Sequence, residues 1–205
     1  MSGRTLVLVR HGRTAWNHEG RLQGQLDIGL DEHGHAQARQ VAPQIAALRP
    51  SLLWCSDLER TRQTVAPIAE ASGLEPVFDK RLREFSFGEY ESLSHAELAE
   101  RDPAGYAALR AGRYDDVPAA EPTEAVRARM VEALTELLAE LAPGETGVAI
   151  SHGAAIREAT VALLGWPPEQ THSLRGLDNC GRVELVETPG VAGGPLRLRA
   201  YNRTA

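Results

Sequence analysis

The chain has few cysteines, and this excludes two kinds of stabilising framework. Cys55 and Cys180 are its two cysteines among 205 residues. Two cysteines this far apart provide neither a disulfide framework nor the paired spacing of a zinc site. Both lie in apolar surroundings in the sequence, so we expect buried, reduced thiols.

Long apolar runs are also missing. The first apolar run, Leu6–Val9, comes directly after a short polar start. A secretory signal needs an apolar region of about 7–15 residues, and a membrane span needs about 20. Repeats and low-complexity tracts are absent from the sequence as well. We therefore expect a soluble, cytoplasmic protein that does not bind membranes.

Basic residues do not outnumber acidic ones. The sequence has 22 Lys and Arg against 28 Asp and Glu, a formal net charge of −6 at pH 7. Proteins that bind nucleic acid usually show the opposite balance, so we expect no nucleic-acid partner. A local cluster of arginines can still attract a small anion whatever the net charge is. A small anionic molecule therefore remains the expected partner.

What the chain does contain is an alternation of strand-like and helix-like segments. Thr5–Val9 and Thr146–Ile150 are continuous apolar runs, typical of strands covered on both faces. Thr123–Leu141 places its apolar residues on one helical face, with Thr123 as the expected N-cap. The other expected strands are Leu52–Cys55, Arg182–Glu187 and Leu196–Tyr201, and the other expected helices are Gly34–Leu48, Leu58–Ser72 and Gly153–Leu164. This order predicts a three-layer α/β/α fold with a mostly parallel sheet and an antiparallel edge formed by the last two strands.

The segment 85–122 breaks this alternation. It has short helical patches, Gly and Pro breaks, and the aromatic residues Phe85, Phe87, Tyr90, Tyr106 and Tyr114. We interpret it as a short helical lid inserted into a single domain that spans residues 1–205; an ordinary packing excursion is the alternative. Apolar residues near the chain's end and the edge strands of the sheet allow a homodimer.

Two histidines follow apolar strands in the same way. Arg10-His11-Gly12 ends the first strand, and Ser151-His152-Gly153 follows another, with a helix directly behind it. Ligands of open α/β sheets bind at the carboxyl ends of the strands. An arginine there matches phosphate oxygens, and a neutral imidazole can act as a nucleophile. A single histidine is more often structural; the repeated pattern favours a site.

Two further segments point to the same edge. Ser56–Thr64 follows the strand Leu52–Cys55 and opens a helix, so Arg60 can reach the edge; a surface ion pair with Glu59 is the alternative. The segment Arg81–Gly88 places Glu84 between apolar neighbours, which suits a proton donor; a solvated loop residue is the alternative.

These segments together resemble the histidine phosphatase superfamily, in its phosphoglycerate-mutase-like branch. Arg10-His11-Gly12 with Thr14, Trp16 and Asn17 resembles the family's nucleophile motif. The segments Arg21–Gly24, Ser56–Thr64, Leu82–Glu91 and Ser151–Gly153 resemble its later motifs, in order and over nearly the whole chain.

The resemblance implies a role for each matching residue. His11 would be the nucleophile that carries a phosphohistidine, and Glu84 would protonate the leaving oxygen and then activate water. Arg10, Arg60 and His152 would bind phosphoryl oxygens. The substrate-binding residues would be Asn17, Gln23, Gly24 and Gly153. No cofactor is implied, and the scattered carboxylates show no metal-ligand spacing.

Three positions depart from the family's pattern. Arg13 stands where many members have Glu, Ser92 stands where Gly is common, and Glu121-Pro122-Thr123 replaces a usual turn. We expect Ser92 to restrict the acid loop. None of the three removes a residue with an implied catalytic role.

Within this family the reaction is a phosphomonoester hydrolysis or a phosphoglycerate mutase reaction. A mutase must exclude water and hold a bisphosphorylated intermediate, so it needs extra cations in its lid. Between Arg83 and Arg127 this chain has only Arg101, Arg110 and Arg113, with no adjacent basic pair. This favours a phosphatase. The resemblance implies a sugar phosphate or phosphoglycerate derivative as the substrate, including a glucosylated phosphoglycerate; phosphoserine and α-ribazole phosphate are further candidates.

A hypothesis from another class is a non-catalytic module that senses phosphate or binds protein on the same fold. The joint presence of His11, Glu84 and His152 argues against it, because a binder needs no proton donor. Arg13, Arg113 or another lid cation could bind a carboxylate on the substrate; a solvated surface role is the alternative for each.

Overall fold

In a computed structural model of the chain, which describes residues 3–188 and 193–205, six strands form one sheet in the order β3-β2-β4-β1-β5-β6. The strands are β1 (Thr5–Arg10), β2 (Leu52–Cys55), β3 (Val77–Phe78), β4 (Thr146–Ser151), β5 (Arg182–Glu187) and β6 (Leu196–Arg203). β1, β2, β3 and β4 run parallel. β5 is antiparallel to β1 and to β6, which forms the expected antiparallel edge.

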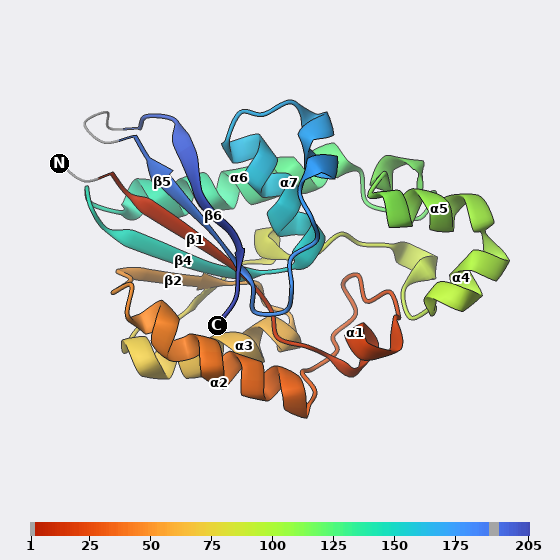
Figure 1. The fold of residues 1–205 in the computed structure, drawn as a ribbon, viewed down its shortest axis with the longest axis horizontal. Coiled ribbons are helices and arrows are strands. Elements are labelled where there is room, and N and C mark those ends of the chain that lie inside the picture. The colour runs from red at the N-terminus through yellow and green to blue at the C-terminus, as the bar shows by residue number, and fades with distance from the viewer. Residues whose placement is uncertain (1–2, 189–192) are drawn as a thin grey trace.

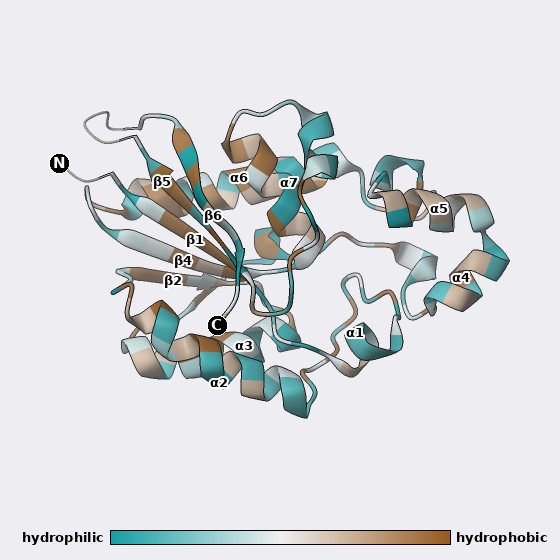
Figure 2. Cartoon of the chain, viewed as in Figure 1, coloured by the Kyte–Doolittle hydropathy of each residue, from teal (hydrophilic) through white to brown (hydrophobic). Residues whose placement is uncertain are grey.

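Helices cover both faces of this sheet (Figure 1). α2 (Glu32–Ala46) and α3 (Glu59–Ser72) pack on one face, and α6 (Thr123–Glu140) and α7 (Gly153–Leu163) pack on the other. β1 explains why both faces bury apolar groups: Val7 and Val9 pack with α2 and α3, whereas Leu6 and Leu8 pack with α6 and α7. In Figure 2, β1 is largely hydrophobic, whereas the edge strand β6 alternates between hydrophobic and hydrophilic residues. The three-layer α/β/α prediction is therefore confirmed.

The segment 85–122 contains α4 (His95–Arg101) and α5 (Pro103–Ala111), which lie beyond the carboxyl ends of β1 and β4 (Figure 1). Three short 3-10 turns accompany these helices: Lys80–Leu82, Gly88–Tyr90 and Tyr114–Asp116. The aromatic rings of the segment pack inward, with the Phe85 and Tyr114 ring centres 4.6 Å apart. Phe85 is fully buried and belongs to the core below α6 and α7. The aromatic residues of the segment therefore anchor it to the core.

Some local predictions were wrong in detail. Thr123 does not cap α6: it is the first helical residue, and its N–H donates to the Asp115 carboxylate at 2.8 Å. The short elements β3, α1 (Ala15–Glu19) and a 3-10 turn at Pro168–Ser173 were not expected. Ser92 adopts a left-handed φ of 75°, the conformation that glycine prefers, so its backbone is strained. Restriction of the acid loop stays a prediction.

Both thiols are buried and unpaired, as expected. Burial raises the pKa of Cys180 to about 12, so this thiol stays protonated. Across the described residues, no helix combines the length and the apolar character that crossing a bilayer requires.

Candidate active site

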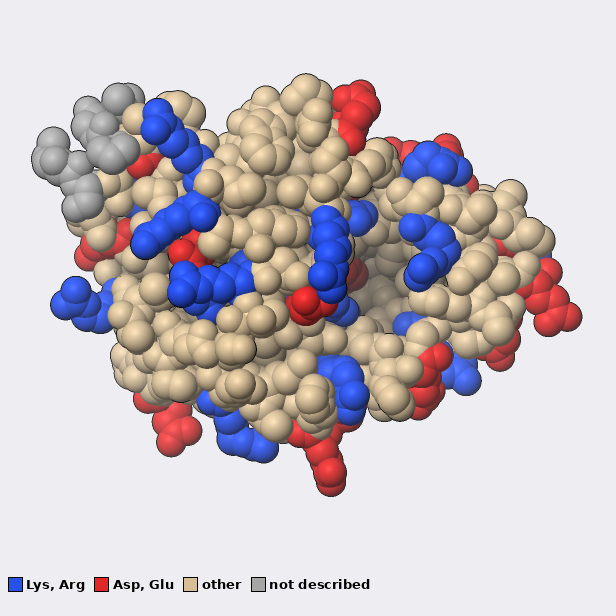
Figure 3. All heavy atoms as spheres, in the orientation of Figure 1, with Lys and Arg blue, Asp and Glu red and all other residues tan. Residues whose placement is uncertain are grey.

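A cavity of about 300 Å³ opens where the carboxyl ends of β1 and β4 meet α5 and α7. Figure 3 shows this hollow between the body of the sheet and the helical segment α4–α5, with basic side chains around it. The volume is at the low end of sites for small molecules, which span about 300–1,000 Å³. In the described part of the chain, one acid, Glu84, and five arginines line it: Arg10, Arg21, Arg60, Arg110 and Arg157. The cavity is therefore strongly cationic in a chain of net negative charge.

His11 follows β1 and is buried, with 3% of its surface exposed. Its Nδ1 lies 2.7 Å from the Gly12 carbonyl oxygen, which can only accept a hydrogen bond. Nδ1 therefore carries the proton, and Nε2 keeps its lone pair. Burial and the nearby Arg60 and Arg10 hold the pKa of His11 well below its usual range. The imidazole is thus neutral at pH 7, the form a nucleophile needs.

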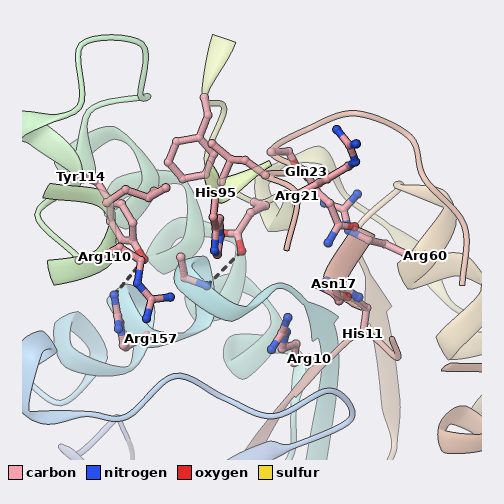
Figure 4. Close-up of a pocket in the computed structure, with 17 residues that line it drawn as sticks. Arg10, His11, Asn17, Arg21, Gln23, Arg60, His95, Arg110, Tyr114 and Arg157 are labelled. Carbon is pink, nitrogen blue, oxygen red and sulfur yellow. Dashed lines mark hydrogen bonds between the residues drawn. The ribbon is translucent and has the colours of Figure 1, made fainter. Parts of the chain in front are cut away.

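Arg10 and Arg60 reach the cavity from β1 and α3 (Figure 4). Arg60 is 1% exposed and donates to the carbonyl oxygens of Gly24 at 2.7 Å and Leu26 at 2.8 Å. The surface ion pair with Glu59 is not formed. Burial lowers the pKa of Arg60 to about 10, so it remains charged at pH 7. Arg10 donates to the Leu177 carbonyl, and its buried Nε has no partner among the described residues.

His152 lies behind the wall of the cavity and is fully buried. Its ring centre is 5.3 Å from that of His11. Its Nδ1 accepts from Arg60 Nε at 3.2 Å, so its Nε2 carries the proton and donates to Ser56 Oγ at 2.9 Å. Burial is the main reason that the pKa of His152 is well below its usual range, with Arg60 adding to it. A phosphoryl oxygen can receive the Nε2 hydrogen only if it replaces Ser56.

Glu84 faces the cavity from the loop that follows the 3-10 turn Lys80–Leu82, and the N-terminus of α7 holds its carboxylate. One carboxylate oxygen accepts from the Ala154 N–H at 3.0 Å, and the other accepts from the N–H groups of Ala155 at 2.9 Å and Phe85 at 3.1 Å. The partial positive charge of a helix N-terminus favours this arrangement. The carboxylate is therefore fixed in place rather than solvated in a loop.

Three of the four expected substrate-binding residues line the cavity: Asn17, Gln23 and Gly24. Thr14 and Asn179 donate to Asn17 Oδ1, at 3.1–3.3 Å, and Thr14 Oγ1 donates to Gln23 Oε1 at 3.0 Å. The side-chain oxygens of both amides are thus engaged, which leaves their N–H groups for a ligand.

Two glycines of the site lie close to neighbouring side chains. Gly24 has a φ of 52°, and a Cβ there would lie 2.0 Å from Glu91 Oε1. Gly153 does not line the cavity; a Cβ on it would meet Arg10 Nε at 3.3 Å. Gly153 therefore makes room for Arg10 at the start of α7.

The structure adds residues to which the sequence analysis gave no role in the site. Tyr114, His95 and three arginines, Arg21, Arg110 and Arg157, also line the cavity. Arg157 is the least obvious of them. The signal that could have found it is helical spacing: Ala154 and Arg157 are three residues apart and share one face of α7.

Of the cations considered as carboxylate binders, Arg13 and Arg113 lie elsewhere. Arg13 pairs with Asp31 at 2.7 Å, and Arg113 pairs with Asp116 at 2.9 Å. Neither lines the cavity. Arg101 pairs with Glu89, so Arg110 is the one arginine of α4 and α5 that reaches the cavity among the described residues.

Comparisons with known proteins identify the family. A sequence profile of the histidine phosphatase superfamily (branch 1) matches residues 6–194. The chain belongs to the histidine phosphatase superfamily. It is 38% identical over 192 residues, which are 92% of this chain and 88% of the relative, to the probable phosphoglycerate mutase GpmB of Cronobacter sakazakii.

Solved phosphatase structures share the fold of this chain. A mycobacterial glucosyl-3-phosphoglycerate phosphatase in complex with VO3 superposes with a TM-score of 0.91 at 32% identity, covering 98% of this chain and 100% of that one. A phosphoserine phosphatase mutant of Entamoeba histolytica superposes with a TM-score of 0.81 at 27% identity, covering 97% and 96%. Family and neighbours support phosphoryl-transfer catalysis of the phosphatase or mutase type.

Proposed function

We propose that this histidine phosphatase hydrolyses a small phosphomonoester through a phosphohistidine on His11, without a metal ion or cofactor. The observation that carries the proposal is the orientation of His11. The Gly12 carbonyl binds the Nδ1 hydrogen and so leaves the Nε2 lone pair free, and Arg10 and Arg60 supply the charge that a phosphoryl group needs.

In the first step His11 Nε2 attacks phosphorus and the P–O bond to the alcohol breaks. Arg10 and Arg60 compensate the charge on the equatorial oxygens, with donors from Asn17 and Gln23. The Nε2 hydrogen of His152 turns from Ser56 Oγ to a phosphoryl oxygen. Glu84 gives its proton to the leaving alkoxide.

In the second step the ionised Glu84 removes a proton from water, and the hydroxide attacks the phosphohistidine. The N–P bond breaks and restores neutral His11 and inorganic phosphate. One carboxylate thus serves as acid and then as base, which is possible because both displacements occur at the same phosphorus position.

The cavity's lid side favours hydrolysis over the mutase reaction. Of the three lid arginines, Arg101 and Arg113 pair with acids, so only Arg110 faces the described cavity. The likeness to glucosyl-3-phosphoglycerate phosphatase supports a phosphorylated sugar or glycerate as the substrate. The mutase reaction is the second candidate, because the curated relatives carry that name and Arg157 adds a cation that the sequence analysis did not count.

The test of the proposed function is turnover of p-nitrophenyl phosphate in the presence of EDTA. We expect release of phosphate that is lost in His11→Ala, and an acid-labile phosphoryl adduct on the parent protein alone. An adduct that still forms in His11→Ala would overturn the proposal. Tight phosphate binding without turnover of any phosphomonoester would instead support a non-catalytic module. When 3-phosphoglycerate is the substrate, release of inorganic phosphate indicates a phosphatase, and formation of 2-phosphoglycerate indicates a mutase.

Glu84→Gln tests the proton donor. We expect the rate with an alkyl phosphate to fall by about 10²–10⁴-fold, and the rate with p-nitrophenyl phosphate to fall far less in the first step, because nitrophenolate leaves without a proton. A burst of nitrophenol isolates that first step from the hydrolysis of the phosphohistidine. Equal losses of the first step for both esters would remove Glu84 as the acid.

A further inference from the structure

The arginines that line the cavity lie at two ends of it. In Figure 4, Arg10, His11 and Asn17 lie together at one end, whereas Arg110, Tyr114 and Arg157 lie together at the other. The two groups come from different parts of the fold: β1 and the loop after it on one side, and the lid segment with α7 on the other. A phosphoryl group held by Arg10 and Arg60 leaves the second group of cations unused.

Arg157 is partly buried and incompletely bonded. One of its terminal nitrogens donates to the Tyr114 hydroxyl at 2.9 Å, and its buried Nε has no partner in the described part of the chain. No carboxylate oxygen of residues 3–188 and 193–205 lies within 4 Å of it, whereas most arginines of the chain have such a partner. A partly buried guanidinium without a counter-ion is unfavourable unless a ligand supplies the charge.

Arg110 adds a second, exposed cation near the same place. Arg110 lies on α5, two residues before Gly112. Gly112 lies against Arg157, since a Cβ on Gly112 would be 2.8 Å from the Arg157 guanidinium. Arg110 has no carboxylate within 4 Å among the described residues either. Burial, together with Arg110, lowers the pKa of His95, so this neighbour adds no charge at pH 7.

The charge of this end suits a monoanion better than a phosphate dianion. The C-terminus of α5 at Gly112 lies against Arg157, and a helix C-terminus carries a partial negative charge of about −0.5. The Tyr114 hydroxyl, whose pKa burial raises to about 12, stays neutral and orients the guanidinium. A planar carboxylate matches the two-donor edge of a guanidinium.

We propose that Arg157, oriented by Tyr114 and assisted by Arg110, forms a second anion subsite that binds a carboxylate of the substrate. The substrate class is then a phosphomonoester of a hydroxy acid rather than a neutral sugar phosphate. This inference rests on the proposed phosphomonoesterase activity. It assigns specificity to a residue of α7 that takes no part in the transfer of the phosphoryl group.

The experiment compares two substrates of equal size. 3-Phosphoglycerate carries a carboxylate where glycerol 1-phosphate carries a hydroxymethyl group. We expect the parent protein to prefer the carboxylate by about 10- to 100-fold in kcat/KM, the range for a hydrogen bond to a charged group. Arg157→Gln should bring this ratio to within about threefold of one, and Arg157→Lys should keep part of it. Arg110→Gln should lower it by about two- to fivefold, because an exposed ion pair is weak.

The ratio is measured within each variant, so a general loss of activity cancels. Arg113→Gln is the matched control, because Arg113 is an exposed arginine of the same segment that pairs with Asp116, and its ratio should equal that of the parent. A ratio that Arg157→Gln leaves unchanged would overturn the inference while the proposed function stands.

Calorimetric binding to the His11→Ala protein tests the subsite independently of turnover. Arg157→Gln in this background should weaken 3-phosphoglycerate and leave glycerol 1-phosphate unaffected. If it weakens both ligands equally, Arg157 belongs to the phosphoryl site, and the inference is wrong. If it weakens 2,3-bisphosphoglycerate more than 3-phosphoglycerate, the subsite takes a phosphate, and the assignment to a carboxylate is wrong.

Discussion

The two buried histidines make the stability of this protein depend on pH above the range in which carboxylates titrate. His11 is 3% exposed and His152 fully buried, and burial with Arg60 holds the pKa of each well below 6.5. In the unfolded chain each histidine titrates near pH 6.5. Below that pH the unfolded state binds more protons, so the free energy of unfolding falls as the pH is lowered.

The magnitude follows from the number of protons. For one histidine that stays neutral in the folded state, the loss between pH 7.5 and pH 5.5 is about 1.4 kcal/mol, and for two it is about 2.7 kcal/mol. The partly buried His95, whose pKa is also lowered, acts in the same direction. Carboxylates whose pKa is lowered by ion pairs, such as Asp57 and Asp79, lose their contribution at lower pH and do not contribute here.

Urea unfolding at the two pH values measures this effect, in a buffer without phosphate because the site binds anions. His11→Gln and His152→Gln should each reduce the loss by about 1.4 kcal/mol, whatever they do to the stability at pH 7.5. The double variant should remove the contribution of this pair. A free energy of unfolding that is equal at pH 7.5 and pH 5.5 in the parent would refute the reasoning.

Three other substitutions have expected outcomes. Arg60→Ala should lower kcat/KM for phosphomonoesters by about 10²–10³-fold, because it removes a preorganised cation; a loss below about tenfold would show that Arg60 does not bind the phosphoryl group. Gly24→Ala should weaken phosphate binding in calorimetry, because its methyl group would displace Glu91 and the loop that holds Arg60; unchanged affinity would contradict this. Ser92→Gly should raise the free energy of unfolding by about 0.5–1 kcal/mol, since it relieves a φ of 75°, and a lower value in thermal or urea unfolding would contradict the strain.

Strands and long helices could be predicted because their signals are local. The expected strand at Thr5–Val9 ends one residue before the observed β1. The expected helix Leu58–Ser72 and α3 end at the same residue, and Gly73 follows with a left-handed φ of 73°. β3 could not be predicted, since it has two exposed residues and exists only through its pairing with β2. The prediction that Thr123 caps α6 was wrong, because the Asp115 carboxylate, eight residues upstream, accepts a hydrogen bond from the first N–H of the helix.

The phosphoryl end of the site could be predicted for a different reason. The carboxyl ends of parallel strands meet at one edge, so residues that follow β1, β2 and β4 must be close in space. The other end could not, because whether an arginine is available depends on partners distant in the sequence. Arg13 looked available but pairs with Asp31. Helical spacing places Arg157 on the same face of α7 as Ala154, but it does not show that Arg157 is unpaired by any carboxylate in the described residues.

Helix α7 connects the two ends of the cavity. Its first amides hold Glu84, Arg157 follows one turn later, and a buried ion pair between Glu158 and Arg127 fixes it to α6. The spacing between the acid and residue 157 is therefore constant. Redesign of the substrate range can accordingly be confined to the surroundings of Arg157, with Glu84 and the amides that hold it left in position.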